Sequence, residues 1–241
     1  MCLLICIRRD DGGLAIAANR DEYYDRLSLA PYAWAGRPRI LAGRDMRAGG
    51  TWLAVNEHGV LAAVTNRATI DGDDPTRPTR GQLPLLACDY RTAAQAAGAL
   101  SKHLERDRYN GFNLFFADAA DAFIVEAPGP RAAIVPLPPG LHVGANAGFN
   151  DPADVRVARA KALLADLDLD VPGDALVGRL QEVCRDHSPL AGALPLCIHG
   201  QRAGTRSSSI IVLSPGRRLE RYLHAAGPPC EYEYEKVTMP W

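Results

Sequence analysis

The order in which strand-like and helix-like segments follow one another constrains the fold of this chain most strongly. Short apolar runs bounded by turn residues, a pattern typical of strands, occupy the first 70 residues, the middle of the chain and its C-terminal part. Blocks with helical periodicity separate these three groups. Segregated strands and helices favour an α+β fold, with helices layered on a mostly antiparallel sheet.

Two hairpins are expected near the N-terminus. Residues 2–7 and 14–18 flank the turn at 10–13, and the strands at 51–55 and 60–65 flank Asn56, Glu57, His58 and Gly59. Further strands are expected at residues 112–117, 122–126, 132–137, 141–145, 208–213, 219–225 and 231–237.

Three helices are expected between the strand groups. The first covers residues 82–105, the second 152–166 and the third 174–185. Asp151 is the expected N-cap of the second helix, with Pro152 at its first position. The polar, proline-rich stretch 71–80 is expected to be a surface loop. No repeat or shift in composition marks a boundary, so residues 1–241 are expected to form a single domain.

Charge and hydropathy exclude several classes of function. The 27 basic and 28 acidic residues leave a net charge of −1, which argues against a nucleic-acid partner. No apolar run approaches the roughly 20 residues that span a bilayer, so we expect no transmembrane segment. The apolar start of the chain lacks the basic region and cleavage site of a signal peptide. A soluble, cytoplasmic protein is therefore expected.

Six cysteines in a chain of this length do not suggest a disulfide framework. None has the local spacing of a zinc site or a haem attachment, so we expect no metal site and no required cofactor. Cys2 stands apart because removal of Met1 would expose its α-amine. That amine, with a pKa of roughly 7.7–8.0, can take the thiol proton and activate Cys2 as a nucleophile. The alternative is that Cys2 is an apolar residue that begins a buried strand.

Four consecutive polar residues, Asn19, Arg20, Asp21 and Glu22, follow an apolar strand. If the strand continues, Asn19 and Asp21 share one face, and Arg20 and Glu22 share the other. Asp21 could then orient the N-terminal group, and Arg20 could hold a ligand carboxylate or phosphate. Asn19, Arg20 and Glu22 are therefore candidate ligand-binding residues. The alternative is a salt-linked turn that leaves the sheet.

These residues belong to a series of motifs that resembles the NRDE family, also called the transport and Golgi organisation protein 2 family. One departure is Leu27 after Arg26, where a proline is expected. The motifs run in family order along the chain: Met-Cys at 1–2, AANRDE at 17–22, GGTWL at 49–53, LAAVTN at 61–66, YNGFNL at 109–114 and GTRSSSI at 204–210.

That family resembles the N-terminal nucleophile hydrolases of the penicillin V acylase and bile acid hydrolase type, which implies a four-layer αββα sandwich. The resemblance implies that Cys2 is the nucleophile and that Asp21 contacts it. It also implies that Asn66 is the oxyanion donor, and that Asn146 anchors the α-amine or the substrate. Arg206 is implied to keep the pKa of the thiol low.

One departure concerns the cation near the nucleophile. The acylases carry an arginine where this chain has Ala18, and Arg20, two residues on, would face the same side of an extended strand. Arg20 could replace the missing arginine or bind a different ligand.

Two classes of function follow from the resemblance. One is hydrolysis of a linear amide or a related acyl bond at Cys2. The other is a non-catalytic carrier of haem or of lipid and acyl-CoA, with haem as a transported ligand. The six histidines show no spacing diagnostic of haem ligation. A third possibility is that Cys2 has only a structural role. The sequence does not indicate an oligomeric state.

Overall fold

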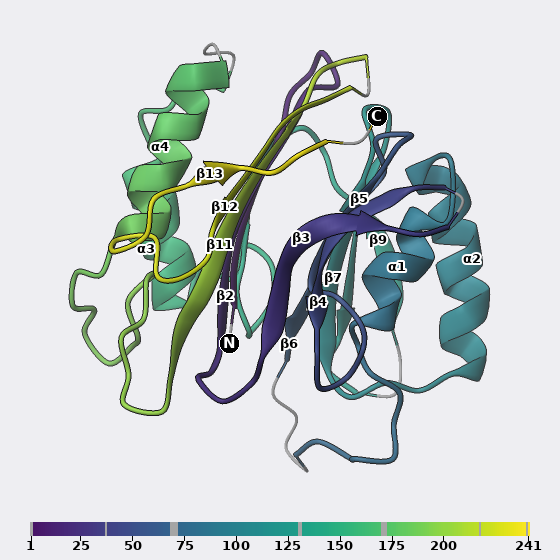
Figure 1. The fold of residues 1–241 in the computed structure, drawn as a ribbon, viewed down its shortest axis with the longest axis horizontal. Helices are drawn as coiled ribbons and strands as arrows, with labels where there is room; N and C mark the ends of the chain where they lie inside the picture. The colour runs from purple at the N-terminus through teal and green to yellow at the C-terminus, as the bar shows by residue number, and fades with distance from the viewer. Residues whose placement is uncertain are drawn as a thin grey trace.

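Two antiparallel sheets lie face to face, and helices cover the outer face of each (Figure 1). This is a computed structural model, and it describes all residues except 1, 37, 68–71, 130–131, 170–172, 217 and 240. Met1, and Asp71 at the start of the expected loop, therefore lie outside the described residues.

The first sheet has six strands, and every neighbouring pair in it is antiparallel. It combines the N-terminal hairpin with C-terminal strands, so the two ends of the chain share one sheet. In spatial order its strands are β10 (Gly140–Gly144), β1 (Cys2–Arg8), β2 (Leu14–Tyr23), β11 (Ala203–Leu213), β12 (Leu219–Ala225) and β13 (Glu235–Lys236).

The second sheet has seven strands, and their spatial order is their order along the chain. Each strand pairs antiparallel with the next, as in a meander. The strands are β3 (Ser28–Trp34), β4 (Ile40–Asp45), β5 (Leu53–Asn56), β6 (Leu61–Asn66), β7 (Phe112–Ala117), β8 (Ala122–Ala127) and β9 (Ala133–Pro136).

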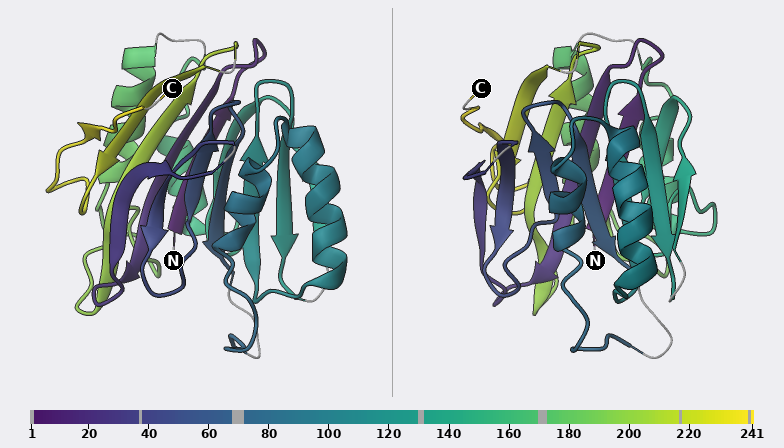
Figure 2. Two further views of the ribbon diagram at one scale, coloured as in Figure 1. Left: turned by 45° about the vertical axis from the view of Figure 1, so that its right-hand side comes forward. Right: turned by 90° about the vertical axis from the view of Figure 1, so that its right-hand side faces the viewer.

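The helices complete four layers (Figure 2). Helices α3 (Val155–Leu163) and α4 (Gly173–Arg185) pack on the six-stranded sheet. Helices α1 (Gln82–Cys88) and α2 (Ala93–Arg106) pack on the seven-stranded sheet. The αββα arrangement expected from the resemblance is confirmed. None of these helices, in the part of the chain that is described, has the length and apolar character needed to cross a bilayer.

Strand β1 is a continuous run of apolar residues because both of its faces are buried. Leu3, Ile5 and Ile7 pack in the core beneath α3 and α4, while Leu4 and Cys6 pack between the two sheets. Successive side chains point to opposite faces of a strand, and here both faces are buried. A third core lies between the seven-stranded sheet and helices α1 and α2.

The helix predictions need two corrections. The expected helix at 82–105 is two helices, and Thr92 caps the second by accepting a hydrogen bond from the backbone N–H of Gln95. The N-cap of the next helix is Asp154 rather than Asp151, so Pro152 lies in a turn before the helix. Asp154 accepts hydrogen bonds from two backbone N–H groups of the first turn, which Asp151 is too far upstream to reach.

The strand predictions need three corrections. Strands β3 and β4 were not expected: β3 is a largely exposed edge strand, so it lacks a clear apolar pattern. Strand β2 continues through the polar residues to Tyr23. The expected strand at 231–237 is reduced to Glu235–Lys236, because the backbone N–H of Tyr232 bonds to the carbonyl of Pro228 in a turn.

Asn56 holds the turn of the second hairpin against helix α1. Its side-chain Nδ2 donates to the carbonyl oxygens of Cys88 (2.8 Å) and Tyr90 (2.7 Å). Its Oδ1 accepts from the backbone N–H groups of His58 and Val60, both at 2.9 Å. The side chain is fully buried and uses its whole hydrogen-bonding capacity.

We therefore expect Asn56→Ala to lower the free energy of unfolding by about 3 kcal/mol, because it strands buried donors and acceptors. Urea unfolding followed by circular dichroism measures the loss. Glu57→Ala, in the same turn, is the matched control and should stay closer to the wild-type midpoint, because the ion pair and the backbone hydrogen bond that it removes, both with Arg39, are exposed to solvent. Equal midpoints for the two variants would contradict this account.

Candidate active site

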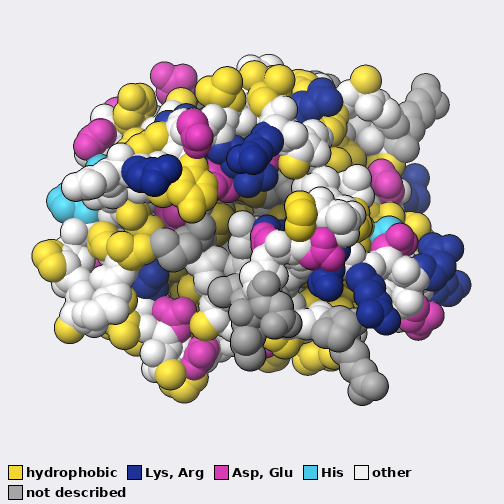
Figure 3. All heavy atoms as spheres, turned by 90° about the horizontal axis from the view of Figure 1, so that it is seen from below, with side chains coloured by type: hydrophobic (Ala, Val, Ile, Leu, Met, Phe, Trp, Pro, Cys, Tyr) yellow, Lys and Arg dark blue, Asp and Glu magenta, His cyan; other side chains and the backbone are white. Residues whose placement is uncertain are grey.

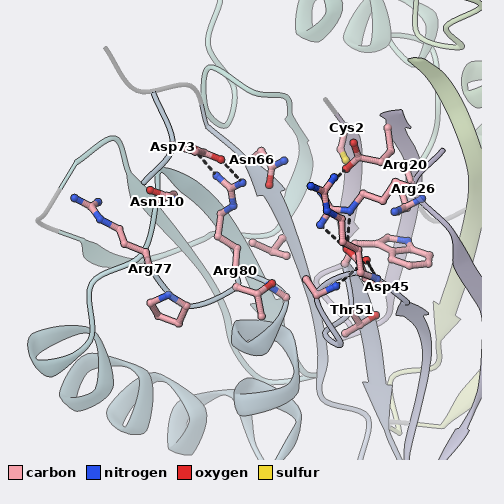
Figure 4. Close-up of a pocket in the computed structure, with 18 of the residues that line it drawn as sticks. Cys2, Arg20, Arg26, Asp45, Thr51, Asn66, Asp73, Arg77, Arg80 and Asn110 are labelled. Carbon is pink, nitrogen blue, oxygen red and sulfur yellow. Dashed lines mark hydrogen bonds and ion pairs between the residues drawn. The ribbon is translucent and has the colours of Figure 1, made fainter. Parts of the chain in front are cut away.

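Cys2 opens into a cavity of about 360 Å³ at the ends of strands from both sheets (Figure 4). In the register of β1 and β2, Cys2 lies directly opposite Arg20, so the two side chains share a face. Glu22 and Asn66, the last residue of β6, also line this cavity. Four of the predicted site residues are therefore brought together.

Arg20 is the buried cation of the cavity. Its guanidinium carbon lies 4.6 Å from the centre of the Trp52 ring, a cation–π distance. Gly43 makes room for this ring, because a Cβ atom there would lie 2.5 Å from it. Arg20 is 4% exposed, and its Nη2 has no hydrogen-bond partner among the described residues. Ala18 is buried between the sheets, so Arg20 is the arginine of this strand that reaches the cavity.

A second arginine of the cavity is fully compensated. Arg26 pairs with Glu22 (3.2 Å) and with Asp45 (2.6 Å). Burial by itself opposes ionisation of Asp45, but hydrogen bonds from Arg26 and from the backbone of Arg47 hold the pKa of Asp45 below its usual value. This network holds the two carboxylates in place, so they do not pair with Arg20, whose guanidinium is available to an anion.

The expected surface loop before α1 forms the opposite wall. The backbone N–H of Asp74 donates to Asn110, whose Nδ2 donates back to the carbonyl of Asp74. Arg77 donates to the carbonyl of Tyr109, and Arg80 to that of Gly111. The segment 109–111 therefore pins the described part of this loop over the cavity (Figure 4).

Asn146 lies beside Asn66 and contacts its main chain. The side-chain Nδ2 of Asn146 donates to the carbonyl oxygen of Asn66. Asn113 in turn donates to the carbonyl of Ala145, the residue before Asn146, at 2.9 Å. Asn146 is not among the described residues that line the cavity. In this geometry Asn146 positions Asn66.

Asn19 and Asp21 face the helix layer, on the other side of β2. Asn19 donates to the carbonyls of Cys184 (2.9 Å) and Leu196 (3.0 Å). Asp21 forms a buried ion pair with Arg156 at 2.9 Å and accepts from Thr205 at 2.7 Å. Burial raises the pKa of Asp21, and the charge of Arg156 opposes this rise.

Arg206 occupies a bulge of β11 opposite the polar end of β2. Its guanidinium carbon lies 5.8 Å from the centre of the Tyr24 ring. Like Asn146, it is not among the described residues lining the cavity, whereas Arg20 is. The structure thus places Arg20, rather than Arg206, beside the thiol.

Burial dominates the electrostatics of Cys2 and raises the pKa of its thiol. The Asp21 carboxylate adds to that rise, whereas a hydrogen bond from the backbone of Asp21 and, to a smaller extent, the positive charge of Arg20 oppose it. At neutral pH the thiol is therefore protonated. Nucleophilic attack requires a base that takes this proton at the site.

The outer face near the N-terminus carries both signs of charge. Seen from below, Lys and Arg side chains alternate with Asp and Glu side chains (Figure 3). This agrees with the near-zero net charge. Selectivity for an anion must then come from groups inside the cavity, such as Arg20.

Sequence reasoning missed three parts of this site. The sequence predicts that Trp52, in the GGTWL segment, belongs to the core or to a pocket wall, but it does not predict the contact of Trp52 with Arg20. The Arg26–Asp45 pair was hidden because β4 was not expected. The third is Arg156, a buried arginine in the first turn of α3. Its position on the apolar face of the helix could have indicated this role, because a buried charged residue is rare without a partner.

Sequence comparisons point to one family. The family model described as Transport and Golgi organisation 2 matches residues 1–224. The Transport and Golgi organization protein 2 homolog of Bos taurus is 30% identical over 230 residues, which cover 83% of this chain and 82% of the bovine protein. The Mus musculus homolog is 29% identical over 231 residues, with the same coverage.

Solved structures share the fold. Penicillin V acylase from Agrobacterium tumefaciens superposes with a TM-score of 0.62 at 15% identity, covering 93% of this chain and 83% of that one. The Caenorhabditis elegans ortholog of N-acylethanolamine-hydrolyzing acid amidase also gives 0.62 at 15% identity, covering 89% of this chain and 93% of that one. At these identities the likeness establishes the fold alone.

The placement of Arg20 predicts how the reactivity of Cys2 depends on pH. Alkylation of Cys2 by iodoacetamide should rise with pH as the thiolate forms. Arg20→Gln removes a charge that stabilises the thiolate, so the midpoint should move to higher pH and alkylation at pH 8 should slow by roughly three- to tenfold. Peptide mass spectrometry follows the modification.

Arg206→Gln is the matched control. It removes the same charge from the bulge of β11, outside the cavity, and should leave the pH profile close to wild type. A larger shift from Arg206→Gln than from Arg20→Gln would contradict the placement of the two cations.

Proposed function

The chain belongs to the Transport and Golgi organisation 2 family, and we propose that it is a cysteine N-terminal nucleophile hydrolase that cleaves a linear amide or related acyl bond. The observation that carries the proposal is the position of the Cys2 thiol. It lies at the start of β1, in a cavity that Arg20 and Asn66 also line. The fold shared with acylases and an amidase supports the same chemistry.

The proposed reaction begins once Met1 is removed. The freed α-amine of Cys2 takes the thiol proton, and the thiolate attacks the carbonyl carbon of the substrate. The side-chain amide of Asn66 donates to the oxyanion that develops. The C–N bond then breaks as the leaving amine takes the proton from the Cys2 ammonium. The α-amine of Cys2 then deprotonates a water molecule, which attacks the carbonyl carbon of the thioester. The C–S bond breaks, the acid is released and the Cys2 thiolate takes the proton back from the α-amine.

Other residues act by positioning. Asn146 fixes the main chain of Asn66, and the Asp21–Arg156 pair fixes the end of β2 that carries Arg20. Of the predicted ligand-binding residues, Arg20 and Glu22 line the cavity, while Asn19 is bound to main-chain carbonyls on the opposite face. Ligand recognition is therefore proposed for Arg20, with Glu22 holding Arg26 beside it. The proposed location is the cytoplasm, where six free cysteines stay reduced.

Three measurements test the hydrolase proposal. Intact-mass analysis should show loss of Met1, and a thiol-reactive acyl probe should label Cys2 in wild type but not in Cys2→Ala. Asn66→Ala should reduce turnover of an amide substrate by about a hundred- to a thousandfold, since it removes one oxyanion donor. Gln95→Ala, which removes an exposed side-chain amide of α2 outside the cavity, is the control and should keep the activity. Retention of Met1 in the native protein would rule out the free-amine mechanism.

A second candidate is a non-catalytic carrier of an anionic acyl ligand or of haem. The buried, unpartnered Nη2 of Arg20 favours it, because acyl-CoA phosphates or haem propionates can accept from this group. A carrier should bind acyl-CoA, or give a saturable Soret shift with haem, with equal affinity in wild type and Asn66→Ala. The thioester of acyl-CoA should remain intact. Cleavage of the ligand, or the absence of saturable binding, would contradict this candidate.

A further inference from the structure

Four metal-ligating side chains that do not line the cavity converge in space, although they are dispersed in the sequence. His187, Cys197 and His199 belong to the loop between α4 and β11, and Cys230 belongs to the turn after β12. No motif spacing predicts this group, because Cys230 lies at least 31 residues from each of the others along the chain.

Three of these side chains form a compact triangle. The sulfurs of Cys197 and Cys230 are 3.5 Å apart, and Nε2 of His199 lies 3.0 Å from the sulfur of Cys230 and 3.9 Å from that of Cys197. Around a tetrahedral Zn²⁺ with bonds of about 2.3 Å to sulfur and 2.0–2.1 Å to nitrogen, such atoms stand about 3.5–3.8 Å apart. The mean of the three distances in the triangle is thus close to the distance expected between two ligand atoms of such a zinc ion.

His187 supplies the fourth corner. Its ligand atom lies within 4.8 Å of those of His199 and Cys230, and its imidazole meets that of His199 edge-on with ring centres 6.0 Å apart. The ring is exposed, so a small rotation of the side chain closes the remaining distance. From these contacts we propose that His187, Cys197, His199 and Cys230 bind one Zn²⁺ ion in a structural site.

Both imidazoles have outer partners that orient them. Nδ1 of His187 lies 3.1 Å from the carbonyl oxygen of Arg185, which leaves Nε2 for the metal. Nδ1 of His199 faces the carboxylate of Glu231 at 3.6 Å, so its Nε2 also points to the cysteines. Second contacts of this kind hold metal-bound histidines in the correct tautomer. Binding releases two thiol protons as two Zn–S bonds form.

The place of this site in the fold explains what the ion would do. It joins the C-terminal turn to the loop after α4, beside an existing contact between Arg185 and the carbonyl of Pro229. The carbonyl of Ile198, between two of the ligands, accepts a hydrogen bond from the backbone N–H of Thr205, and the N–H of Ile198 donates to the Thr205 hydroxyl. That hydroxyl in turn donates to Asp21. Zinc would therefore stiffen the segment that supports the polar end of β2.

Zinc titration of the reduced, metal-stripped protein tests the proposal. In competition with a chromophoric chelator, wild type should bind one equivalent of Zn²⁺. A hundredfold excess of free Zn²⁺ over Kd should raise Tm by roughly 5–10 °C. Co²⁺ in place of Zn²⁺ should give the intense visible bands of a tetrahedral site and a thiolate charge-transfer band.

Variants at the surface of the cluster separate this site from adventitious binding. Cys230→Ser and His199→Ala should each weaken Zn²⁺ binding by on the order of a hundredfold or more and abolish the cobalt spectrum. Cys2→Ser and His58→Gln remove a thiol and an imidazole elsewhere and should bind Zn²⁺ as wild type does. Stoichiometric binding that survives in Cys230→Ser, or the absence of such binding in wild type, overturns the proposal. A Cys197–Cys230 disulfide in the freshly isolated protein also overturns it.

Discussion

The antiparallel pairing of β1 with β2 is the interaction on which the site depends. Its register places Cys2 opposite Arg20. Because side chains alternate along a strand, this pairing also decides which face of β2 each of the other polar residues occupies. Arg20 and Glu22 face the cavity, whereas Asn19 and Asp21 face the helices. A slip of one residue would exchange the two sets and bury Arg20 beneath α3 and α4.

Burying these charged side chains costs free energy, and the surrounding contacts offset that cost to a different extent for each of them. Asp21 is paired with Arg156, and Asp45 is paired with Arg26. Arg20 has the face of Trp52 but leaves one nitrogen without a partner among the described residues. Such an uncompensated donor is what an anion, or the thiolate of Cys2, would satisfy. The same burial raises the pKa of the thiol, so reactivity depends on a nearby proton acceptor.

Several residues in or beside the family motifs have structural roles around the cavity. Gly50 and Gly81 approach so closely that a Cβ atom on Gly50 would lie 2.5 Å from the backbone of Gly81. This contact brings the start of α1 to the GGTWL segment. Asn110, which lines the cavity, and Asn113 bond to main-chain groups of two loops. The motifs therefore build the walls as well as supply the reactive groups.

The sequence by itself determined the α+β class, most of the strands and the face on which Arg20 lies. Apolar periodicity and the alternation of side chains along a strand are local properties, so they can be recognised in the sequence without knowledge of the fold. The sequence did not reveal β3, because an exposed edge strand has weak patterning. Nor did it reveal β4, a short and mostly buried strand that pairs with β3 and β5. It also could not indicate which cation lies beside Cys2, that Asn146 contacts the main chain of Asn66, or that Cys197 meets Cys230. Only the tertiary structure decided these contacts, because each joins segments far apart in the chain that come together when the sheets and their covering helices pack.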